Sequence, residues 1–280
     1  MSASEFPAIR ESDATGEVAA IFADLRATLG VPFVNLIWRH LATIPEMLSW
    51  TWDASKPLYT SLEFAEVSTE LQQMVQSPLV GSIPLFVYDA FGLTKNLRVI
   101  AGLIAAYNKA NASNLTALLV AQALLRGHMA KGRGFTRLDA APAPTACSLP
   151  RLLQFSELAE PLQKLVGSLD QFGRVAPSNA IASLYCHLAH WPSFLAMVHT
   201  ALLPVHESGT LKAEQGRVLA GGKELANTRL LPLATSGSLP SEENRSRAYT
   251  AMESFTELMI ARMLVMGTVM LELVPCQHDA

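Results

Sequence analysis

An eleven-residue segment occurs twice in this chain, in diverged form and without a gap. The first copy runs from Trp38 to Leu48 and the second from Tyr185 to Leu195. Five matching positions are identical: His40/His187, Leu41/Leu188, Ala42/Ala189, Pro45/Pro192 and Leu48/Leu195. Copies about half a chain apart predict two tandem halves that pack as an internal pseudo-dimer. A pocket is then expected between the halves, where small-molecule sites often form.

The segment between the two copies contains a stretch with the composition of a linker. Residues 127–150 are rich in Gly, Ala, Pro and Thr. A stretch of this composition separates helices rather than extending them. We therefore predict an N-terminal helical repeat over 1–128, a linker over 129–150 and a C-terminal helical repeat over 151–280. Half of the 280 residues are apolar, so the chain can bury a sizeable core.

The apolar residues recur at helical spacing in almost every segment. This periodicity predicts helices near residues 34–41, 62–75, 162–169 and 245–274, and a weaker helix over 211–225 that Gly216 and Gly221-Gly222 interrupt. Residues 97–125 are expected to form two helices divided at 108–114, because Asn and Ser compete for backbone hydrogen bonds. No strand alternation is bounded by hairpin signals, so the sequence predicts an all-α fold.

Charge and cysteine content argue against several classes of function. The net charge is −3, and only residues 131–137 are locally basic, which argues against a nucleic-acid partner. Cys147, Cys186 and Cys276 are odd in number and far apart. This pattern does not favour a disulfide framework, a structural zinc site or a dithiol redox site, and it is typical of a reducing cytoplasm.

Neither the N-terminus nor the longest apolar run predicts a membrane association. The first residues lack the basic-then-apolar layout of a signal peptide. The apolar run from Leu258 to Val274 contains Arg262 and Glu272, so it is interpreted as a buried helix rather than a membrane span. Phosphate-binding loops, zinc-protease motifs and nucleophile elbows are also missing, and we expect no cofactor.

Several polar residues are candidates for a site, each with a simpler structural alternative. His187 and His190 have metal-ligand spacing, but His40 matches His187 in the other half, which favours hydrogen-bonded structural histidines. Asn111 either contacts a ligand or caps a helix. Ser183 either caps a helix or lines a pocket. Acidic residues near predicted turns are expected to be solvated, namely Asp53, Asp89, Asp139 and Asp170.

Five segments of the chain resemble the group I 2-haloacid dehalogenases, which act on both D- and L-substrates. They are GEVAAIFAD at 16–24, LGVPFV at 29–34, RHLATIP at 39–45, YNKAN at 107–111 and LAHWP at 188–192. The similarity extends over nearly the whole chain. It implies an all-α protein of two pseudo-symmetric halves, related to the alkyl hydroperoxidase D-like fold, with the active site between them. It also implies hydrolysis of a carbon–halogen bond by direct attack of an activated water, without an ester intermediate.

The resemblance also assigns site residues by position. Asn111 stands where the family has the Asn of its water-activating pair, and the position of the Asp partner falls on Leu184, after a retained Ser183. The pocket Trp of the family corresponds to Phe33, and a Phe one turn later corresponds to Leu36. The pocket Tyr of the last helix falls on Phe255, or on Ser254 if that helix is shifted by one residue. The implied pocket for a small carboxylic acid is therefore more apolar than in the family.

Loss of the Asp bears directly on the reaction. General-base catalysis contributes about 10²–10⁴-fold, or roughly 3–5 kcal/mol, and leucine accepts no proton. His187, one helical turn after Leu184, is a candidate replacement base. Three functions follow: a dehalogenase-type hydrolase with a displaced base, a divergent enzyme acting on another small apolar substrate, or a non-catalytic small-molecule-binding protein. A homodimer is compatible with the low surface charge.

Overall fold

The computed structural model describes residues 7–78, 81–128, 134–138, 149–178, 180–235 and 237–275. Helices predominate in the described part of the chain, and within these ranges the only extended pairing is an isolated bridge between Ser61 and Arg137. The all-α prediction is confirmed. Short 3₁₀ turns at Glu11–Asp13, Thr94–Asn96 and Phe155–Glu157 connect the longer elements.

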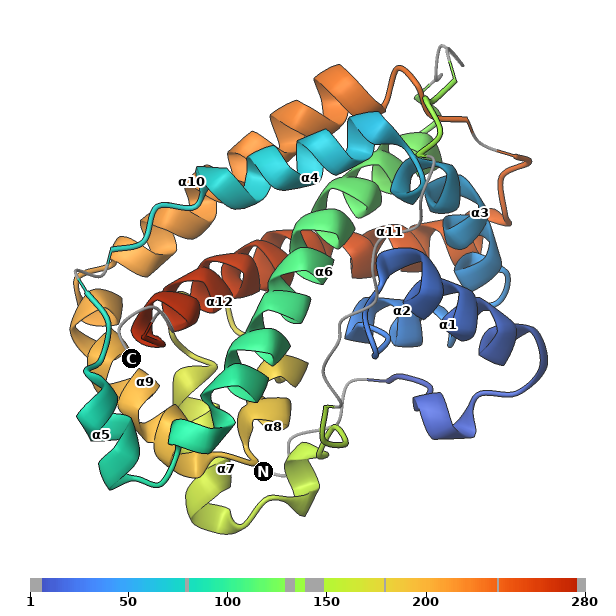
Figure 1. The fold of residues 1–280 in the computed structure, drawn as a ribbon. Helices are drawn as coiled ribbons and strands as arrows, with labels where there is room; N and C mark the ends of the chain where they lie inside the picture. Colours follow the sequence, from blue (N-terminus) through green and yellow to red (C-terminus); the bar gives the residue numbers. More distant parts are fainter. Residues whose placement is uncertain are drawn as a thin grey trace.

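Six α-helices form before the linker (Figure 1). They are α1 (Gly16–Leu29), α2 (Leu36–Leu41), α3 (Met47–Tyr59), α4 (Leu62–Met74), α5 (Leu85–Ala90) and α6 (Leu97–Leu125). Local signals set their ends. α1 stops at Gly30, which adopts a left-handed conformation with φ of 64°. The Ser61 hydroxyl caps α4 by accepting a hydrogen bond from the Phe64 amide.

The second part of the chain contains six further α-helices and two π-helical turns. They are α7 (Glu160–Leu169), α8 (Ser183–Leu188), α9 (Pro192–Glu207), α10 (Thr210–Leu225), α11 (Glu242–Ser254) and α12 (Ala261–Leu273). A π turn at Ala226–Leu230 extends α10, and another at Phe255–Ile260 joins α11 to α12 in one continuous helix. Such π turns often occur at functional sites.

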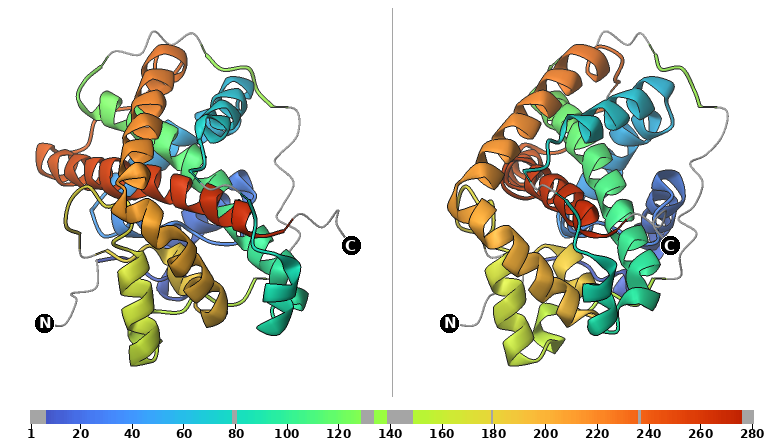
Figure 2. Two further views of the ribbon diagram at one scale, coloured as in Figure 1. Left: turned by 90° about the vertical axis from the view of Figure 1, so that its left-hand side faces the viewer. Right: turned by 60° about the vertical axis from the view of Figure 1, so that its left-hand side comes forward.

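α6 packs against α12 at the centre of the molecule (Figure 2). α4 and α10 lie side by side (Figure 1). Gly267 of α12 permits the close approach of the two central helices, because a Cβ atom there would overlap Oδ1 of Asn108. The Asn108 amide also donates to Thr268 Oγ1 at 3.3 Å. The apolar faces of these central helices are buried and form the core.

The predicted break within residues 97–125 is wrong, because α6 is a single helix of 29 residues. Asn108, Asn111 and Asn114 recur every third residue, so they lie along one face of α6, and all three are buried. Asn108 Nδ2 and Asn114 Oδ1 form hydrogen bonds with side chains of other helices, so these groups do not compete with the backbone of α6. Tertiary partners thus override the weak helix propensity of Asn. The helix-cap interpretation of Asn111 is wrong for the same reason.

The predicted interruption of the helix over 211–225 is also wrong. α10 runs without a break through Gly216, Gly221 and Gly222. A Cβ atom at Gly222 would lie 3.2 Å from Leu115 Cδ2 of α6, and one at Gly221 would lie 2.8 Å from Met74 Sδ of α4. These two glycines therefore serve the close packing of α10 on its neighbours rather than ending the helix.

Both copies of the repeated segment span the end of a short helix and the start of the next helix, which begins two residues earlier in the second copy. Trp38–Leu48 covers the end of α2 and the start of α3, and Tyr185–Leu195 covers α8 and the start of α9. The described part of the linker, residues 134–138, pairs with the loop before α4 through the Leu62 amide and the Thr60 carbonyl. Most of the linker lies outside the described residues. The division into two pseudo-symmetric halves and its boundaries therefore stay predictions.

The long C-terminal helix has the length and hydropathy of a membrane span. Among the described residues, it is the one helix that passes this test, over Glu242–Leu273, and 72% of its apolar window is buried within the protein. It packs against α6 and α10. This burial agrees with the interpretation of the apolar run as a core helix.

Candidate functional site

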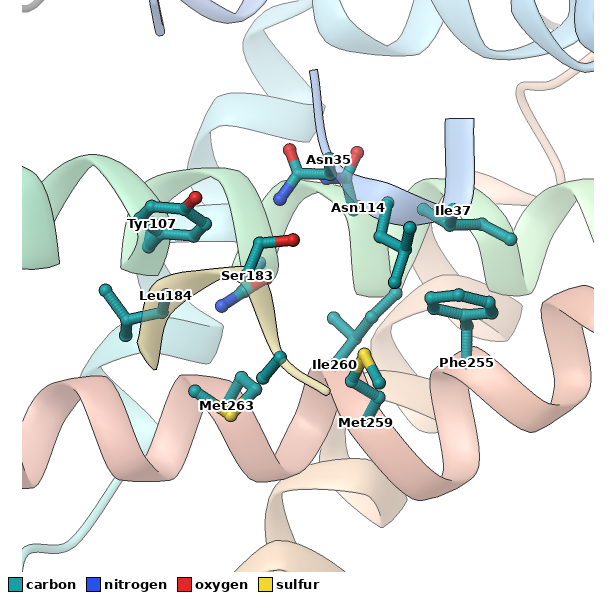
Figure 3. A pocket seen from close by; sticks show the side chains of 13 residues that line it. Asn35, Ile37, Tyr107, Asn114, Ser183, Leu184, Phe255, Met259, Ile260 and Met263 are labelled. Carbon is teal, nitrogen blue, oxygen red and sulfur yellow. The ribbon is translucent and has the colours of Figure 1, made fainter. Parts of the chain in front are cut away.

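A small pocket opens where four segments of the chain meet. The loop into α2, the middle of α6, the start of α8 and the π turn into α12 all direct side chains toward it (Figure 3). It has about 40 Å³ of room for water-sized groups, enough for about three water molecules. Its lining consists of Asn35, Leu36, Ile37, Tyr107, Asn111, Asn114, Ala182, Ser183, Leu184, Phe255, Met259, Ile260 and Met263.

The amide of Asn114 has a fixed orientation. Its Oδ1 accepts hydrogen bonds from Trp38 Nε1 at 2.9 Å and from the Tyr59 hydroxyl at 2.8 Å. Because an indole nitrogen only donates, Oδ1 must face Trp38 and Nδ2 must point elsewhere. Asn114 lines the pocket, so its two N–H groups are available to an acceptor there.

Asn111 contributes a second amide, one turn before Asn114 on α6. It is 6% exposed and lines the pocket, yet its side chain forms no hydrogen bond with any residue in the described ranges. Buried amides in native proteins are normally paired. An unpaired amide at a pocket wall is therefore a group that a bound ligand or water satisfies. Asn35 and Ser183 add further polar groups to the same cavity.

The structure brings together most of the residues that the sequence analysis selected. Leu36, Asn111, Ser183, Leu184 and Phe255 all line the pocket. Phe33 does not. It lies one layer behind, stacked on Tyr107 with ring centroids 4.1 Å apart. Of the described residues that line the cavity, none is Asp or Glu.

Other lining residues were missed by the sequence analysis, among them Asn114, Tyr107 and Met263. The spacing of Asn114 one turn after Asn111 would have revealed it, had residues 97–125 been treated as a single helix.

His187 lies behind Tyr107 rather than in the pocket lining. Its Nε2 lies 2.6 Å from the Pro150 carbonyl oxygen and its Nδ1 lies 3.3 Å from the Tyr107 hydroxyl. A carbonyl only accepts, so Nε2 carries the hydrogen and Nδ1 accepts from the tyrosine. Burial lowers the pKa of His187, although the bond to Pro150 opposes this shift, and burial raises the pKa of Tyr107. Both groups are therefore neutral at pH 7.

The lowered pKa of His187 gives a pH dependence of stability with a definite sign. Below about pH 6.5 the unfolded chain binds a proton at this side chain that the folded chain does not bind, so stability falls as the pH is lowered. We expect His187→Gln to flatten the fall in unfolding free energy between pH 7 and pH 5, by up to about 1.4 kcal/mol per pH unit. Urea unfolding at both pH values measures this difference. His40, whose pKa is also lowered by burial, remains in both proteins, and equal slopes would contradict the assignment.

The histidines do not assemble a metal site within the described residues. His190 Nε2 lies 2.8 Å from the Arg151 carbonyl, as His187 does from that of Pro150. No group of three or more potential ligands occurs in the described part of the chain. The geometry around both histidines matches the structural alternative.

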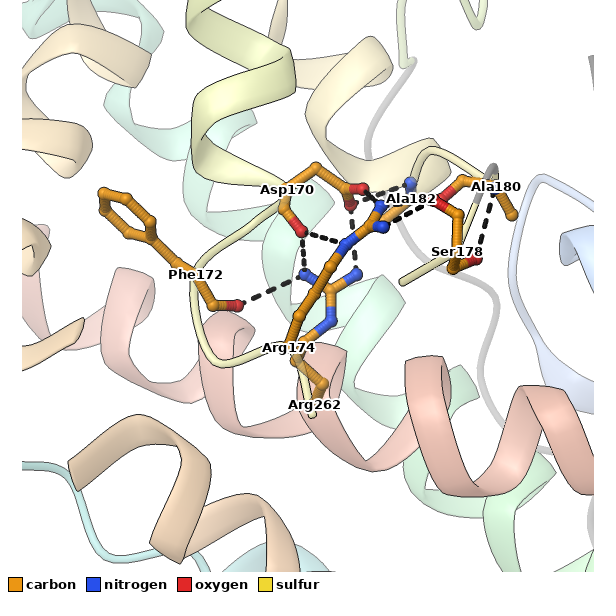
Figure 4. Close-up of polar contacts among 7 residues, drawn as sticks. All are labelled: Asp170, Phe172, Arg174, Ser178, Ala180, Ala182 and Arg262. Atoms are coloured by element: carbon orange, nitrogen blue, oxygen red, sulfur yellow. Dashed lines mark hydrogen bonds and ion pairs between the residues drawn. The ribbon is translucent and has the colours of Figure 1, made fainter. Parts of the chain in front are cut away.

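A buried ionic cluster lies beside the pocket (Figure 4). Asp170 is fully buried and forms ion pairs with Arg174 and with Arg262, the latter at 3.0 Å. Its backbone carbonyl accepts from the same two arginines. The expectation that Asp170 is solvated is therefore wrong: the turn after α7 folds inward against α12, where two guanidinium groups compensate the charge.

The cluster also fixes one wall of the pocket. Asp170 Oδ1 accepts a hydrogen bond from the Ala182 amide at 3.2 Å, immediately before Ser183 and Leu184 at the start of α8. Arg262 lies on α12 between pocket residues Met259 and Met263. Asp170 therefore ties the start of α8 to α12 across the pocket, and it is a positioning residue rather than a lining one.

Comparison with known proteins finds chains that are similar to this one. The family model described as halocarboxylic acid dehydrogenase DehI matches residues 32–185. A configuration-inverting 2-haloacid dehalogenase from Alcaligenes xylosoxydans xylosoxydans is 24% identical over 233 residues, which are 79% of this chain and 76% of the relative.

Solved structures of D-2-haloacid dehalogenases have a similar fold at 19% sequence identity. A mutant has a TM-score of 0.81, with 96% of this chain and 95% of that chain covered. A complex with L-LA has a TM-score of 0.80, with 96% of both chains covered. A mutant complex with D-2-CPA has a TM-score of 0.78, with 96% of this chain and 95% of that chain covered. Since the family model covers more than half of the sequence, the chain belongs to the halocarboxylic acid dehydrogenase DehI family.

Proposed function

We propose that the pocket binds a small carboxylic acid and lacks the base that carbon–halogen hydrolysis by activated water requires. The observation that carries this proposal is the composition of the lining. Amide groups of Asn111 and Asn114 and the hydroxyl of Ser183 meet there, and none of the described lining residues is acidic. Such groups donate hydrogen bonds that solvate an anion. The relatives are named as 2-haloacid dehalogenases, which supports the same ligand class.

Leu184 is the reason for separating binding from hydrolysis. It is buried in the pocket wall, at the position of the family's catalytic Asp by resemblance. A water attacks a saturated carbon efficiently only when a base takes its proton, and this contribution is about 10²–10⁴-fold. Asn111 orients a water but is not basic near neutral pH. We therefore infer that the site holds an acid without activating water against it.

Calorimetric titration of propionate and 2-chloropropionate tests this function. We expect both acids to bind the wild-type chain, and Asn111→Ala to weaken binding about tenfold or more, because it removes a hydrogen bond to a charged group. Asn108→Ala is the matched control. It removes a buried amide one turn earlier on α6, whose side chain faces Thr268 instead of the pocket, and it leaves the affinity unchanged. Chloride measured in the same samples stays at the level of the buffer. Equal affinities of the two variants would refute the site.

A second candidate function is hydrolysis with His187 as a displaced base. The contact between Tyr107 and His187 Nδ1 favours it, since Tyr107 also lines the pocket. In this reaction the attacking water would pass its proton to the Tyr107 oxygen as Tyr107 passes its own to Nδ1, and halide would leave the substrate carbon. Burial disfavours the imidazolium that must form, so we place this candidate second. If the wild-type chain releases chloride and the His187→Gln variant does not, hydrolysis with His187 as the base becomes the favoured function.

The remaining expectations stay predictions. They are the cytoplasmic location, the absence of nucleic-acid and membrane partners, and a homodimer.

A further inference from the structure

Arg39 of α2 is a buried cation that forms no ion pair with any residue that the structure describes. It is 6% exposed, and its one hydrogen bond to a described side chain runs from Nη2 to Ser183 Oγ at 3.3 Å. Its Nε is buried with no hydrogen-bond partner among the described residues. Arg262, the other buried arginine of the described ranges, is instead paired with Asp170. Of the two buried arginines in the described ranges, Arg39 is therefore the one that lacks a described counter-ion.

The carboxylate whose charge acts on Arg39, that of Glu11, is already engaged with other groups. Glu11 acts on the guanidinium only through its field, while its carboxylate pairs with Arg26 Nη1 at 2.6 Å and accepts from the Val34 amide at 2.7 Å. Burial lowers the pKa of Arg39, yet a guanidinium remains protonated at neutral pH. Keeping such a charge in the interior without a counter-ion is costly, and an anion brought close to it would relieve that cost.

Ser183 connects Arg39 to the pocket. Its Oγ accepts from Arg39, which leaves the hydroxyl hydrogen to be donated to another group. Ser183 itself lines the cavity (Figure 3). A hydroxyl that accepts from a cation is polarised and becomes a stronger donor to an anion. The positive charge thus acts on whatever lies against Ser183, although Arg39 does not line the pocket.

We propose that Arg39 determines the charge specificity of the pocket by favouring a carboxylate over a neutral group of the same shape, through Ser183. This inference rests on the proposed function and deepens it, because it assigns the preference for an anion to one residue outside the lining. Arg39 is in this sense a positioning residue, which polarises and holds the hydroxyl that contacts the ligand.

The test compares propionate with propionamide, which has the same shape and no charge. Calorimetry on the wild-type chain is expected to give a preference for the acid of about tenfold or more. Arg39→Met is expected to reduce this preference to within about twofold while leaving propionamide binding unchanged. Lys109→Met is the matched control, since it removes a positive charge that lies on α6 outside the pocket lining, and it keeps the preference.

The melting temperature of the ligand-free protein separates specificity from a purely structural role. Replacing a buried charge by an apolar side chain of similar volume is often neutral or stabilising, so Arg39→Met is expected to melt at the wild-type temperature or above. A lower melting temperature with an unchanged acid-to-amide ratio would overturn the inference. Should Arg39→Met not fold, Ser183→Ala tests the same connection, and retention of the full acid preference in that variant would also overturn it.

Failure of this inference is distinguishable from failure of the proposed function. If the wild-type chain binds neither compound, or binds them independently of Asn111, the proposed function and the role of Arg39 are both refuted. If binding depends on Asn111 but the acid preference survives Arg39→Met, only the role of Arg39 is refuted.

Discussion

Leu184→Asp is expected to release chloride from 2-chloropropionate at a rate about 10²–10⁴-fold above that of the wild-type chain. Residue 184 faces the pocket from the start of α8, and Asn111 and Asn114 line the same cavity from α6. A carboxylate there supplies the missing proton acceptor to a water that the amides orient. Because burial raises the pKa of a carboxyl group, the assay should extend from pH 7 to pH 9. Chloride release over time is the measurement.

Leu184→Asn is the matched control for this substitution. It places a polar side chain of the same size as Asp at the same position but accepts no proton, so its chloride release stays at the wild-type level. Both variants must keep the wild-type circular dichroism spectrum, since each buries a polar group. A folded Leu184→Asp protein that binds the acid and releases no chloride would contradict this prediction. It would show that the pocket differs from the hydrolytic site of the family by more than the loss of the base.

Asp170→Ala is expected to lower the unfolding free energy by about 3–5 kcal/mol, because removing one partner of a buried ion pair leaves the other charge uncompensated. Here two guanidinium groups, those of Arg174 and Arg262, lose the same carboxylate. The Ala182 amide loses its acceptor as well, so the pocket wall before Ser183 should loosen. Urea unfolding monitored by circular dichroism measures the change.

Two further variants give this prediction its controls. Asp53→Ala removes an exposed carboxylate from α3 and is expected to change stability by no more than about 0.5 kcal/mol. Asp170→Asn keeps an acceptor at the same place without the charge and should fall between the wild-type chain and Asp170→Ala. Equal stability of Asp170→Ala and the wild-type chain would mean that the cluster does not hold the turn after α7.

The fold class followed from local information. Apolar residues at helical spacing predicted α4 and α7 close to their observed bounds. Each helix buries one face, and the residues of that face recur in the sequence with the period of a helix. The ends of helices with strong signals were also predictable. Gly30 at the end of α1 is an example, since its left-handed conformation suits glycine.

Features that depend on distant partners were not predictable from one sequence. Asn114 is compatible with the interior of α6 because Trp38 and Tyr59, from α2 and α3, occupy its oxygen. Asp170 is buried because Arg262, 92 residues later, reaches it. These partners are distant in the sequence, so the local pattern did not reveal them. It predicted a helix break at the asparagines of α6 and a solvated side chain at Asp170.

The candidate site was partly predictable. Leu36, Asn111, Ser183, Leu184 and Phe255 were selected by resemblance and line one cavity. Phe33 was displaced from the lining because it stacks on Tyr107, a contact between the loop before α2 and α6. Arg39 carried no sign of special importance in the sequence, since its lack of a counter-ion becomes evident only when the surrounding residues are placed.

A crystal structure of the wild-type chain soaked with 2-chloropropionate is expected to show the intact chlorinated acid in the pocket, with its carboxylate within hydrogen-bonding distance of the Asn111 amide and Ser183 Oγ. Lactate in that position, or an acid bound elsewhere with this cavity holding only water, would refute binding without hydrolysis at this site.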